Sequence, residues 1–384
     1  MGKQMNILIT GAKGFIGKNL TAQLHNIQKG NEKNAFISFD LTIFPFDVDT
    51  DPALLDIYCK EADFVFHLAG VNRPKDPSEF MAGNFGFTSV LLDTLKKHNN
   101  TCPVLLSSSI QAALGNPYGQ SKKAGEDLLF SYAKETGANV FIYRFPNVFG
   151  KWCKPNYNSV VATFCYNIAN NLPITVHDPH VVMNLVYIDD VVEELIRALS
   201  GQAHQIGDYC HVPTVHTIPL GQIADLIRSF QGCRENKRIP DMGNAFTKKL
   251  YATYLSYLPT DGFSYPLQSH EDHRGSFTEV FRTAERGQVS VNISKPHITK
   301  GNHWHHTKNE KFLVVSGQGV IRFRKPDDST VFSYYVSGDM LEVVDIPVGY
   351  THNIENIGDT DMVTLMWASE CFDPAYPDTY FLEV

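Results

Sequence analysis

The sequence of 384 residues lacks the features of secreted and membrane-spanning chains. Its seven cysteines are scattered and include no Cys-x-x-Cys pair, which favours reduced thiols over a disulfide framework. No uncharged apolar run approaches the ~18 residues that a membrane span needs, and no apolar stretch of signal-peptide length opens the chain. We therefore expect a soluble, cytoplasmic protein that does not insert into membranes.

An excess of basic residues is also missing. The chain has 33 Lys and Arg against 41 Asp and Glu, a net charge of −8, whereas nucleic-acid-binding domains are usually basic. Repeats and low-complexity tracts are absent as well. These absences leave a globular protein that binds no nucleic acid, and its length is large enough for at least two domains.

The two halves of the chain differ in pattern. From residue 6 to about 231, short apolar runs alternate with longer helix-like stretches, which predicts a parallel sheet covered by helices on both faces. From about residue 262 onward, short alternating strands separated by Gly, Pro and Asp turns predict an all-β barrel or sandwich. The expected domains are 1–243 and 262–384, joined by a linker at 244–261.

A glycine-rich loop follows the first predicted strand and opens the first predicted helix, which is the setting that a dinucleotide-binding motif requires. Glycines let the backbone approach a pyrophosphate, and a helix N-terminus offers N–H groups to it. The alternative is an ordinary tight turn, which this setting disfavours. The loop residues expected to contact the cofactor are Gly11, Lys13, Gly14, Phe15, Ile16 and Gly17.

Two residues bear on the choice of nicotinamide cofactor. Asp40 directly follows the second predicted strand, 35–39, roughly where an acidic residue binds the ribose of NAD. Lys13 precedes the second glycine of the motif, where a cation can meet the 2′-phosphate of NADP. We expect NADPH, with NADH as the alternative.

A second motif places a tyrosine and a lysine on one helix face. Asn116 is a good N-cap and Pro117 suits the first helical position, so Tyr118 and Lys122 lie one turn apart. A neighbouring ammonium favours the phenolate, which predicts a lowered pKa for Tyr118 and proton transfer to a ketone oxygen. A serine run, 107–109, precedes this helix at the end of a strand and can hydrogen-bond a substrate carbonyl. Either feature alone is also compatible with a chance pair or a polar loop.

Together these motifs resemble the extended short-chain dehydrogenase/reductase family over roughly residues 5–235. The resemblance implies a Rossmann-like, doubly wound parallel sheet of the α/β class, with Ser109, Tyr118 and Lys122 as the catalytic residues. It implies further cofactor contacts by Leu68, Ala69, Gly70, Tyr118 and Lys122. It also implies a nucleotide-sugar substrate near Arg73, Asn84, Asn147 and the segment 151–158, although Arg73 is equally compatible with a solvated surface charge.

The C-terminal half contains a cluster of potential metal ligands. A strand places His303 and His305 on one face, Glu310 opens the next stretch, and a second block adds His352. Three imidazoles and one carboxylate suit Zn, Mn, Fe or Ni, and we expect one divalent metal, with zinc preferred. The alternative is a group of exposed histidines.

These two blocks resemble the motifs of the cupin family, which implies a C-terminal all-β barrel and a homodimer that pairs through its barrels. The segment 272–279 is similar to a motif of the dTDP-4-keto-6-deoxyhexose epimerases, also cupins. That similarity implies that Arg274 holds the substrate diphosphate. In those epimerases the position matching His303 carries the catalytic base and no metal is needed. Here a full set of metal ligands occupies that region, so the identity of the base stays open.

Over nearly its whole length the chain resembles capsular polysaccharide enzymes in which these two domains are fused. The resemblance implies C3 epimerisation of a UDP-2-acetamido-2,6-dideoxy-4-ketohexose in the cupin. NADPH-dependent reduction at C4 then gives UDP-N-acetyl-6-deoxy-L-talosamine, for the UDP-N-acetyl-L-fucosamine pathway. The alternative is a dehydratase or epimerase with tightly bound NAD and a non-catalytic, sugar-binding or dimerising cupin. Dehydratases of this kind usually place Asp and Glu after the Ser, whereas Ile110 and Gln111 follow Ser109.

Overall fold

The computed structural model describes residues 4–31, 36–37 and 40–384 of the chain. The chain forms two compact units. The N-terminal unit is Met1–Arg228 with Lys249–Pro259, and the C-terminal unit is Ser229–Lys248 with Thr260–Val384. The stretch expected as a linker contains the helix α9 (Ala245–Leu255), and the expected boundaries at 243 and 261 stay a prediction.

The N-terminal unit is built on a seven-stranded sheet in the order β2-β1-β3-β4-β5-β9-β8. All neighbouring pairs from β2 to β9 are parallel, and β8 is antiparallel to β9. The strands are β1 (Gln4–Thr10), β2 (Asp40–Phe46), β3 (Phe64–His67), β4 (Val104–Ser109), β5 (Val140–Phe145), β8 (Gln205–Ile206) and β9 (Tyr209–Cys210). A smaller sheet contains β6 (Asn147–Phe149), β7 (Val182–Tyr187) and β10 (His216–Pro219).

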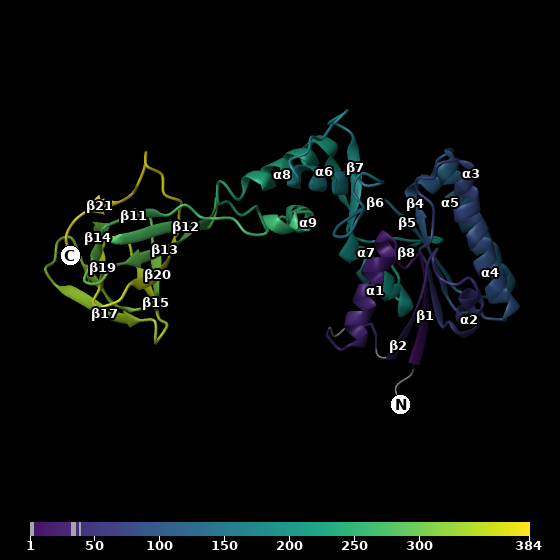
Figure 1. Cartoon of the computed structure of the whole chain (residues 1–384), viewed down its shortest axis with the longest axis horizontal. Coiled ribbons are helices and arrows are strands. Elements are labelled where there is room, and N and C mark those ends of the chain that lie inside the picture. The colour runs from purple at the N-terminus through teal and green to yellow at the C-terminus, as the bar shows by residue number, and fades with distance from the viewer. Residues whose placement is uncertain (1–3, 32–35, 38–39) are drawn as a thin grey trace. The chain divides into compact units, whose positions relative to one another are not determined.

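Helices cover both faces of this sheet (Figure 1), with α1 and α7 on one face and α2, α4 and α5 on the other. These helices are α1 (Phe15–Gln28), α2 (Ala53–Glu61), α4 (Phe87–Lys97), α5 (Pro117–Thr136) and α7 (Ile188–Leu199). Further α-helices of the unit are α3 (Ser78–Phe80), α6 (Val160–Ala169), α8 (Leu220–Gly232), which continues past Arg228, and α9, of which Lys249 onward belongs here.

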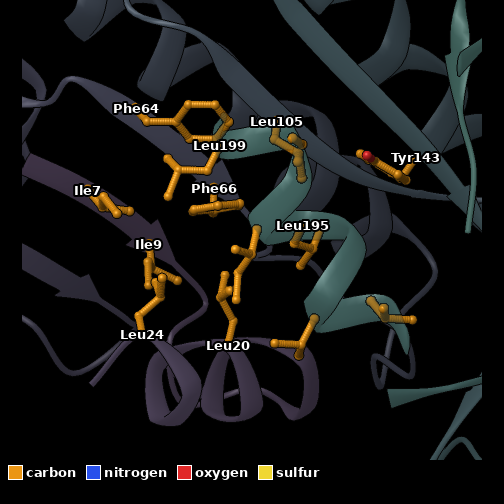
Figure 2. Close-up of a cluster of buried hydrophobic side chains, with 14 of the residues drawn as sticks. Ile7, Ile9, Leu20, Leu24, Phe64, Phe66, Leu105, Tyr143, Leu195 and Leu199 are labelled. Atoms are coloured by element: carbon orange, nitrogen blue, oxygen red, sulfur yellow. The ribbon is translucent and has the colours of Figure 1, made fainter. Parts of the chain in front are cut away.

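Alternation along the strands explains this two-sided burial. In β1, Ile7 and Ile9 pack toward α1 and α7, whereas Leu8 between them packs toward the opposite helices. Figure 2 shows the first of these cores, in which Leu20 of α1 and Leu195 of α7 point at the strand side chains. A strand buried on both faces reads as a continuous apolar run, which is why the sequence predicted a parallel sheet here.

The second strand differs from its predicted position. It was expected at 35–39, of which residues 35, 38 and 39 lie outside the described residues, whereas β2 begins at Asp40. Its register pairs Gln4 with Asp40 and Thr10 with Phe46. The carboxyl end of β2 is therefore followed by Asp47, and Asp40 lies at the other end of the strand.

The C-terminal unit is built on two antiparallel sheets, in the orders β11-β12-β13-β20-β15-β18 and β17-β16-β19-β14-β21. Their strands are β11 (His270–Asp272), β12 (Gly275–Thr283), β13 (Gly287–Ser294), β14 (Thr299–Trp304), β15 (Glu310–Ser316), β16 (Gln318–Arg324), β17 (Val331–Ser337), β18 (Val343–Ile346), β19 (Thr351–Asn356), β20 (Met362–Ala368) and β21 (Tyr380–Phe381). Buried side chains from both sheets, such as Phe312 and Ile354, form one core. The predicted fold class, a doubly wound α/β domain followed by an all-β barrel, is confirmed.

Candidate active site and metal centre

The glycine-rich loop passes very close to the backbone that follows β3. Gly11 has a φ of 70°, and a Cβ on it would lie 2.7 Å from the amide nitrogen of Ala69. A Cβ on Gly17 would lie 2.1 Å from the carbonyl oxygen of Gly11. Only glycine fits either position, so the loop can turn directly from β1 into the N-terminus of α1.

A cavity of about 640 Å³ extends from this loop to the carboxyl ends of β4 and β5. The predicted residues that line it are Gly11, Lys13, Gly14, Phe15, Ile16, Gly17, Leu68, Gly70, Ser109, Tyr118, Lys122 and Asn147. Ligands of open α/β sheets bind at this edge of the sheet. The structure therefore brings the glycine loop and the Ser-Tyr-Lys group into one cavity.

Tyr118 and Lys122 are positioned by the first turns of α5. Asn116 caps this helix as predicted, since its Oδ1 accepts from the amide of Gly119 at 2.8 Å. The buried Lys122 Nζ donates to the carbonyl oxygen of Ser107 at 3.1 Å. Burial lowers the pKa of Lys122 to about 8, against the opposing charge of Glu126.

The predicted lowering of the Tyr118 pKa is wrong. Burial of the phenol raises its pKa, and the hydrogen bond with Ser109 opposes this only in part. The Lys122 ammonium lies 5.9 Å from the centre of the tyrosine ring. Near neutral pH, Tyr118 is therefore a protonated phenol that can donate its proton.

The three serines at the end of β4 have different partners. Ser108 is buried, and its hydroxyl donates to Glu126 Oε1 at 2.6 Å. Glu126 in turn accepts two hydrogen bonds from Arg144, at 2.9 and 2.6 Å. All three serines line the cavity, but the hydroxyl of Ser109 is less tightly held: it accepts a longer bond from the amide of Gln111, at 3.2 Å, and hydrogen-bonds with Tyr118. This arrangement favours Ser109 as the serine that faces a substrate.

Asn84 lies in a short π-helical segment, Met81–Gly86, and is buried. Its Nδ2 donates to the carbonyl of Val71 and to the hydroxyl of Ser121, and its Oδ1 accepts from the amide of Val71. A Cβ on Gly70 would lie 2.8 Å from Asn84 Oδ1 and 2.9 Å from Lys122 Nζ. The polar atoms of Asn84 are thus used to hold the loop after β3 against α5, which indicates positioning rather than substrate contact.

The prediction that Asp40 binds the cofactor ribose is wrong. Asp40 lies six residues before the carboxyl end of β2, about 20 Å from the glycine loop at 3.3 Å per residue. Asp47 occupies the predicted place instead, because its Oδ2 accepts from the amide of Lys13 at 2.7 Å. The side chain of Lys13, expected to meet a 2′-phosphate, forms an exposed ion pair with Asp49.

The remaining predicted substrate contacts separate into two groups. Asn147, at the start of β6, lines the cavity, whereas Arg73 is exposed and does not line it. The segment 151–158 lines the cavity through residues that sequence reasoning did not single out. Trp152 has a φ of 68° and is half exposed, and the Lys18 and Lys151 ammonium groups lie 5.0 and 5.5 Å from its ring. The sequence contained a signal for these cavity-lining residues, because aromatic and lysine side chains are adjacent in this segment.

In the C-terminal unit, the four predicted metal ligands meet at one point. The ligand atoms of His303, His305, Glu310 and His352 all lie within 4.8 Å of one another. His303 pairs directly with His352 across β14 and β19, and Glu310 Oε2 lies 3.5 Å from the Nε2 atoms of both His305 and His352. His306, which follows His305 in the sequence, faces outward and is exposed.

The electrostatics of this cluster fit a divalent cation. His305 and His352 are buried, and their Nε2 atoms have no hydrogen-bond partner. Burial, reinforced by the neighbouring His352, lowers the pKa of His303 to about 4, so its imidazole is neutral. Burial would raise the pKa of Glu310, but His305 and His352 hold it well below its usual range. Three imidazoles and a carboxylate aimed at one point form a suitable donor set.

A second cavity, of about 660 Å³, lies over this cluster. It is lined by three of the ligands and by Asp272, Arg274 and Lys300. The Arg274 guanidinium is exposed and donates from Nε and Nη2 to Asp272 Oδ2, at 3.0 and 2.7 Å. The predicted diphosphate-binding arginine and the candidate metal centre therefore share one cavity.

Known proteins resemble the whole chain. Residues 7–209 match the family described as NAD dependent epimerase/dehydratase, and residues 270–380 match the polysaccharide biosynthesis C-terminal domain. A relative from Pseudomonas aeruginosa, described as UDP-2-acetamido-2,6-beta-L-arabino-hexul-4-ose reductase, is 40% identical over 99% of both chains.

Solved structures agree with this relationship. The capsular polysaccharide assembling protein CapF from Staphylococcus aureus has 57% identity and a TM-score of 0.91, over 99% of this chain and all of its own. UDP-glucose 4-epimerase from Thermotoga maritima, at 20% identity and a TM-score of 0.53, covers 66% of this chain and 98% of its own and shares the fold. The predicted resemblance to fused capsular polysaccharide enzymes is confirmed. The chain therefore belongs to the NAD-dependent epimerase/dehydratase family and carries a polysaccharide biosynthesis C-terminal domain.

Proposed function

We propose that this chain is a bifunctional UDP-sugar enzyme. The C-terminal unit epimerises C3 of a UDP-2-acetamido-2,6-dideoxy-4-ketohexose, and the N-terminal unit then reduces the C4 ketone. The product would be UDP-N-acetyl-6-deoxy-L-talosamine, for capsular polysaccharide synthesis. The name of the Pseudomonas relative, a reductase of a UDP-linked 4-ketosugar, supports the substrate class.

The observation that carries the proposed reduction is the convergence of Ser109, Tyr118 and Lys122 beside the glycine loop. A reduced nicotinamide bound along that loop would supply the hydride. Ser109 would hydrogen-bond the ketone oxygen, and the protonated Tyr118 would donate its proton to the same oxygen. The Lys122 ammonium, held by the carbonyl of Ser107, would stabilise the phenolate that remains.

Epimerisation uses the same ketone differently, because a C4 carbonyl acidifies the proton at C3. Arg274 would leave Asp272 and bind the substrate diphosphate as a bidentate donor. His303, His305, Glu310 and His352 would hold one divalent metal, with zinc favoured by the imidazole-rich donor set. Such a metal polarises a carbonyl when bound, which is the chemistry that enolisation needs.

For the reductase cofactor we propose NADH in preference to NADPH. This reverses the expectation from the sequence, for two reasons. Lys13 is paired with Asp49, and the carboxylate of Asp47 lies beside the backbone of Lys13. A carboxylate can accept from a ribose hydroxyl but repels a 2′-phosphate, so both acidic groups favour the unphosphorylated cofactor.

We also propose that the protein is a homodimer that pairs through its C-terminal unit. The strand β17 lies at the edge of its sheet and exposes Phe332, Tyr334 and Tyr335, and Met340 and Leu341 next to it are about two-thirds exposed. Contiguous exposed apolar side chains of this kind mark interaction surfaces. Tyr335→Glu should shift the mass measured by light scattering from dimer to monomer.

The alternative function is a dehydratase or epimerase that recycles tightly bound NAD, with a non-catalytic C-terminal unit. Cofactor stoichiometry separates the two. Purified protein incubated with a UDP-4-ketosugar and added NADH should oxidise one NADH for each sugar reduced at C4, with the product identified by NMR. Turnover without net NADH oxidation would favour the alternative.

A further inference from the structure

A segment near the C-terminus packs against the candidate metal centre, and it contains none of the metal ligands. We call residues 377–383 the tail segment. Its strand β21 pairs antiparallel with β14, so that Phe381 lies opposite His303 and Tyr380 opposite Trp304. The ring of Tyr380 lies 5.1 Å from that of Trp304, on the outer side of the ligand strand.

Two further contacts of the tail segment adjoin ligands directly. The amide of Leu382 donates to the carbonyl of Asn302 at 3.0 Å, and Asn302 precedes His303. The hydroxyl of Thr351 donates to the carbonyl of Leu382 at 2.5 Å, and Thr351 precedes His352. The tail segment therefore fixes the backbone next to two of the four ligands.

Asp378 makes the densest set of these contacts. Its Oδ1 accepts from the amide of His306 at 2.9 Å. Its Oδ2 accepts from the amides of Thr307 and Lys308, each at 2.9 Å, and from the Thr307 hydroxyl at 3.1 Å. One carboxylate thus organises the whole turn between His305 and β15.

The backbone carbonyl of Asp378 determines which nitrogen of the His305 imidazole carries the proton. The carbonyl oxygen of Asp378 lies 2.6 Å from Nδ1 of His305. A carbonyl oxygen can only accept, so Nδ1 carries the proton, and in the neutral imidazole the lone pair is then on Nε2. That Nε2 is the buried atom without a partner that lies 3.5 Å from Glu310 Oε2.

We propose that Asp378 is a positioning residue of the metal centre. Its carboxylate holds the turn after His305, and its carbonyl oxygen orients the His305 imidazole with Nε2 toward the metal. Groups that donate to or accept from metal-bound histidines typically change metal affinity by about 10–100-fold. The role rests on the metal centre proposed above, and it adds a residue 72 positions away from the motif that contains His306.

The test compares Zn²⁺ binding by the full-length protein and four variants, by competition with a chelator, together with the visible spectrum of the Co²⁺-loaded forms. Asp378→Ala keeps the backbone carbonyl but loses the carboxylate that holds the turn, so Zn²⁺ binding should weaken by about 10-fold, the lower end of this range, and the Co²⁺ spectrum should change. Asp378→Asn should lose less, because Asn keeps one accepting oxygen and tolerates the φ of 38° found here. Asp373→Ala is the matched control, since Asp373 precedes the tail segment and accepts from the amide of Ala375.

Unchanged affinity and an unchanged spectrum in Asp378→Ala would overturn the proposal. If that variant fails to fold, judged by circular dichroism, the comparison of Asp378→Asn with wild type decides in the same way. His305→Ala distinguishes failure of the positioning role of Asp378 from failure of the metal centre itself. Loss of metal in His305→Ala but not in Asp378→Ala rejects the positioning role alone, whereas a wild type that binds no Zn²⁺ rejects the metal centre and the role together.

Discussion

At the scale of single residues, the cofactor preference depends on two carboxylates. Unit charges about 4 Å apart interact by about 1 kcal/mol in water, which is about fivefold in affinity, so each of Asp47 and Asp49 should disfavour NADPH by about that factor. In a fluorescence titration, wild type should bind NADH more tightly than NADPH. Asp47→Asn should narrow the difference between the two affinities, mainly by improving NADPH binding, because it removes a negative charge. The loop should stay in place, because the amide oxygen of Asn can still accept from the backbone of Lys13.

The control for this prediction is Asp40→Asn, which removes a carboxylate at the far end of β2 from Asp47. It should leave both affinities unchanged. Tighter binding of NADPH by wild type would contradict the assignment and restore the role first predicted for Lys13.

A second prediction at this scale concerns pH. Burial lowers the pKa of Lys122 to about 8, so its ammonium is present below that pH and lost above it. The charge stabilises the Tyr118 phenolate, so kcat for ketone reduction should fall as the pH rises through about 8. Lys122→Arg, whose guanidinium stays charged, should lack this fall whatever its absolute rate. A flat wild-type profile across that range would show that Lys122 does not act through its charge.

At the scale of elements, the candidate metal centre joins β14, β15 and β19, so metal binding should stabilise the C-terminal unit. His352→Ala should bind less metal by elemental analysis and should lose the increase in melting temperature that added Zn²⁺ gives wild type. The matched control is His306→Ala, because His306 belongs to the same motif but faces outward. Full metal content in His352→Ala would count against the ligand set.

Local rules predicted the parts of both sites that depend on short sequence spacing. The N-cap, the proline at the helix start and the spacing of Tyr118 and Lys122 follow from helix geometry alone, and the structure has them as predicted. The glycines of the first loop follow from the close approach of the backbone after β3. Such features are encoded within a few residues of one another.

What could not be predicted depends on burial or on distant contacts. The raised pKa of Tyr118 comes from desolvation, which the spacing to Lys122 does not reveal. The position of β2 was ambiguous because apolar residues recur throughout 36–46, and only the turn beginning at Asp47 marks the end of the strand. The contacts of Asp378 connect residues about 70 positions apart, so no motif contains them.

At the scale of the whole molecule, the proposed function combines two independent chemistries on one ketone. Each cavity is lined by residues of a single unit, which supports separate sites.

Within the part of the chain that the structure describes, no helix has both the length and the apolar character needed to cross a membrane.

The most direct test of this account is NMR of the UDP-4-ketosugar in deuterated water with the full-length protein. Without reduced cofactor, wild type and Tyr118→Phe should both exchange the C3 proton for deuterium, whereas His305→Ala should not. With NADH added, Tyr118→Phe should reduce C4 about 10²–10⁴-fold more slowly than wild type, because it lacks the proton donor. Loss of C3 exchange in Tyr118→Phe, or full exchange in His305→Ala, would contradict the assignment of epimerisation to the C-terminal unit.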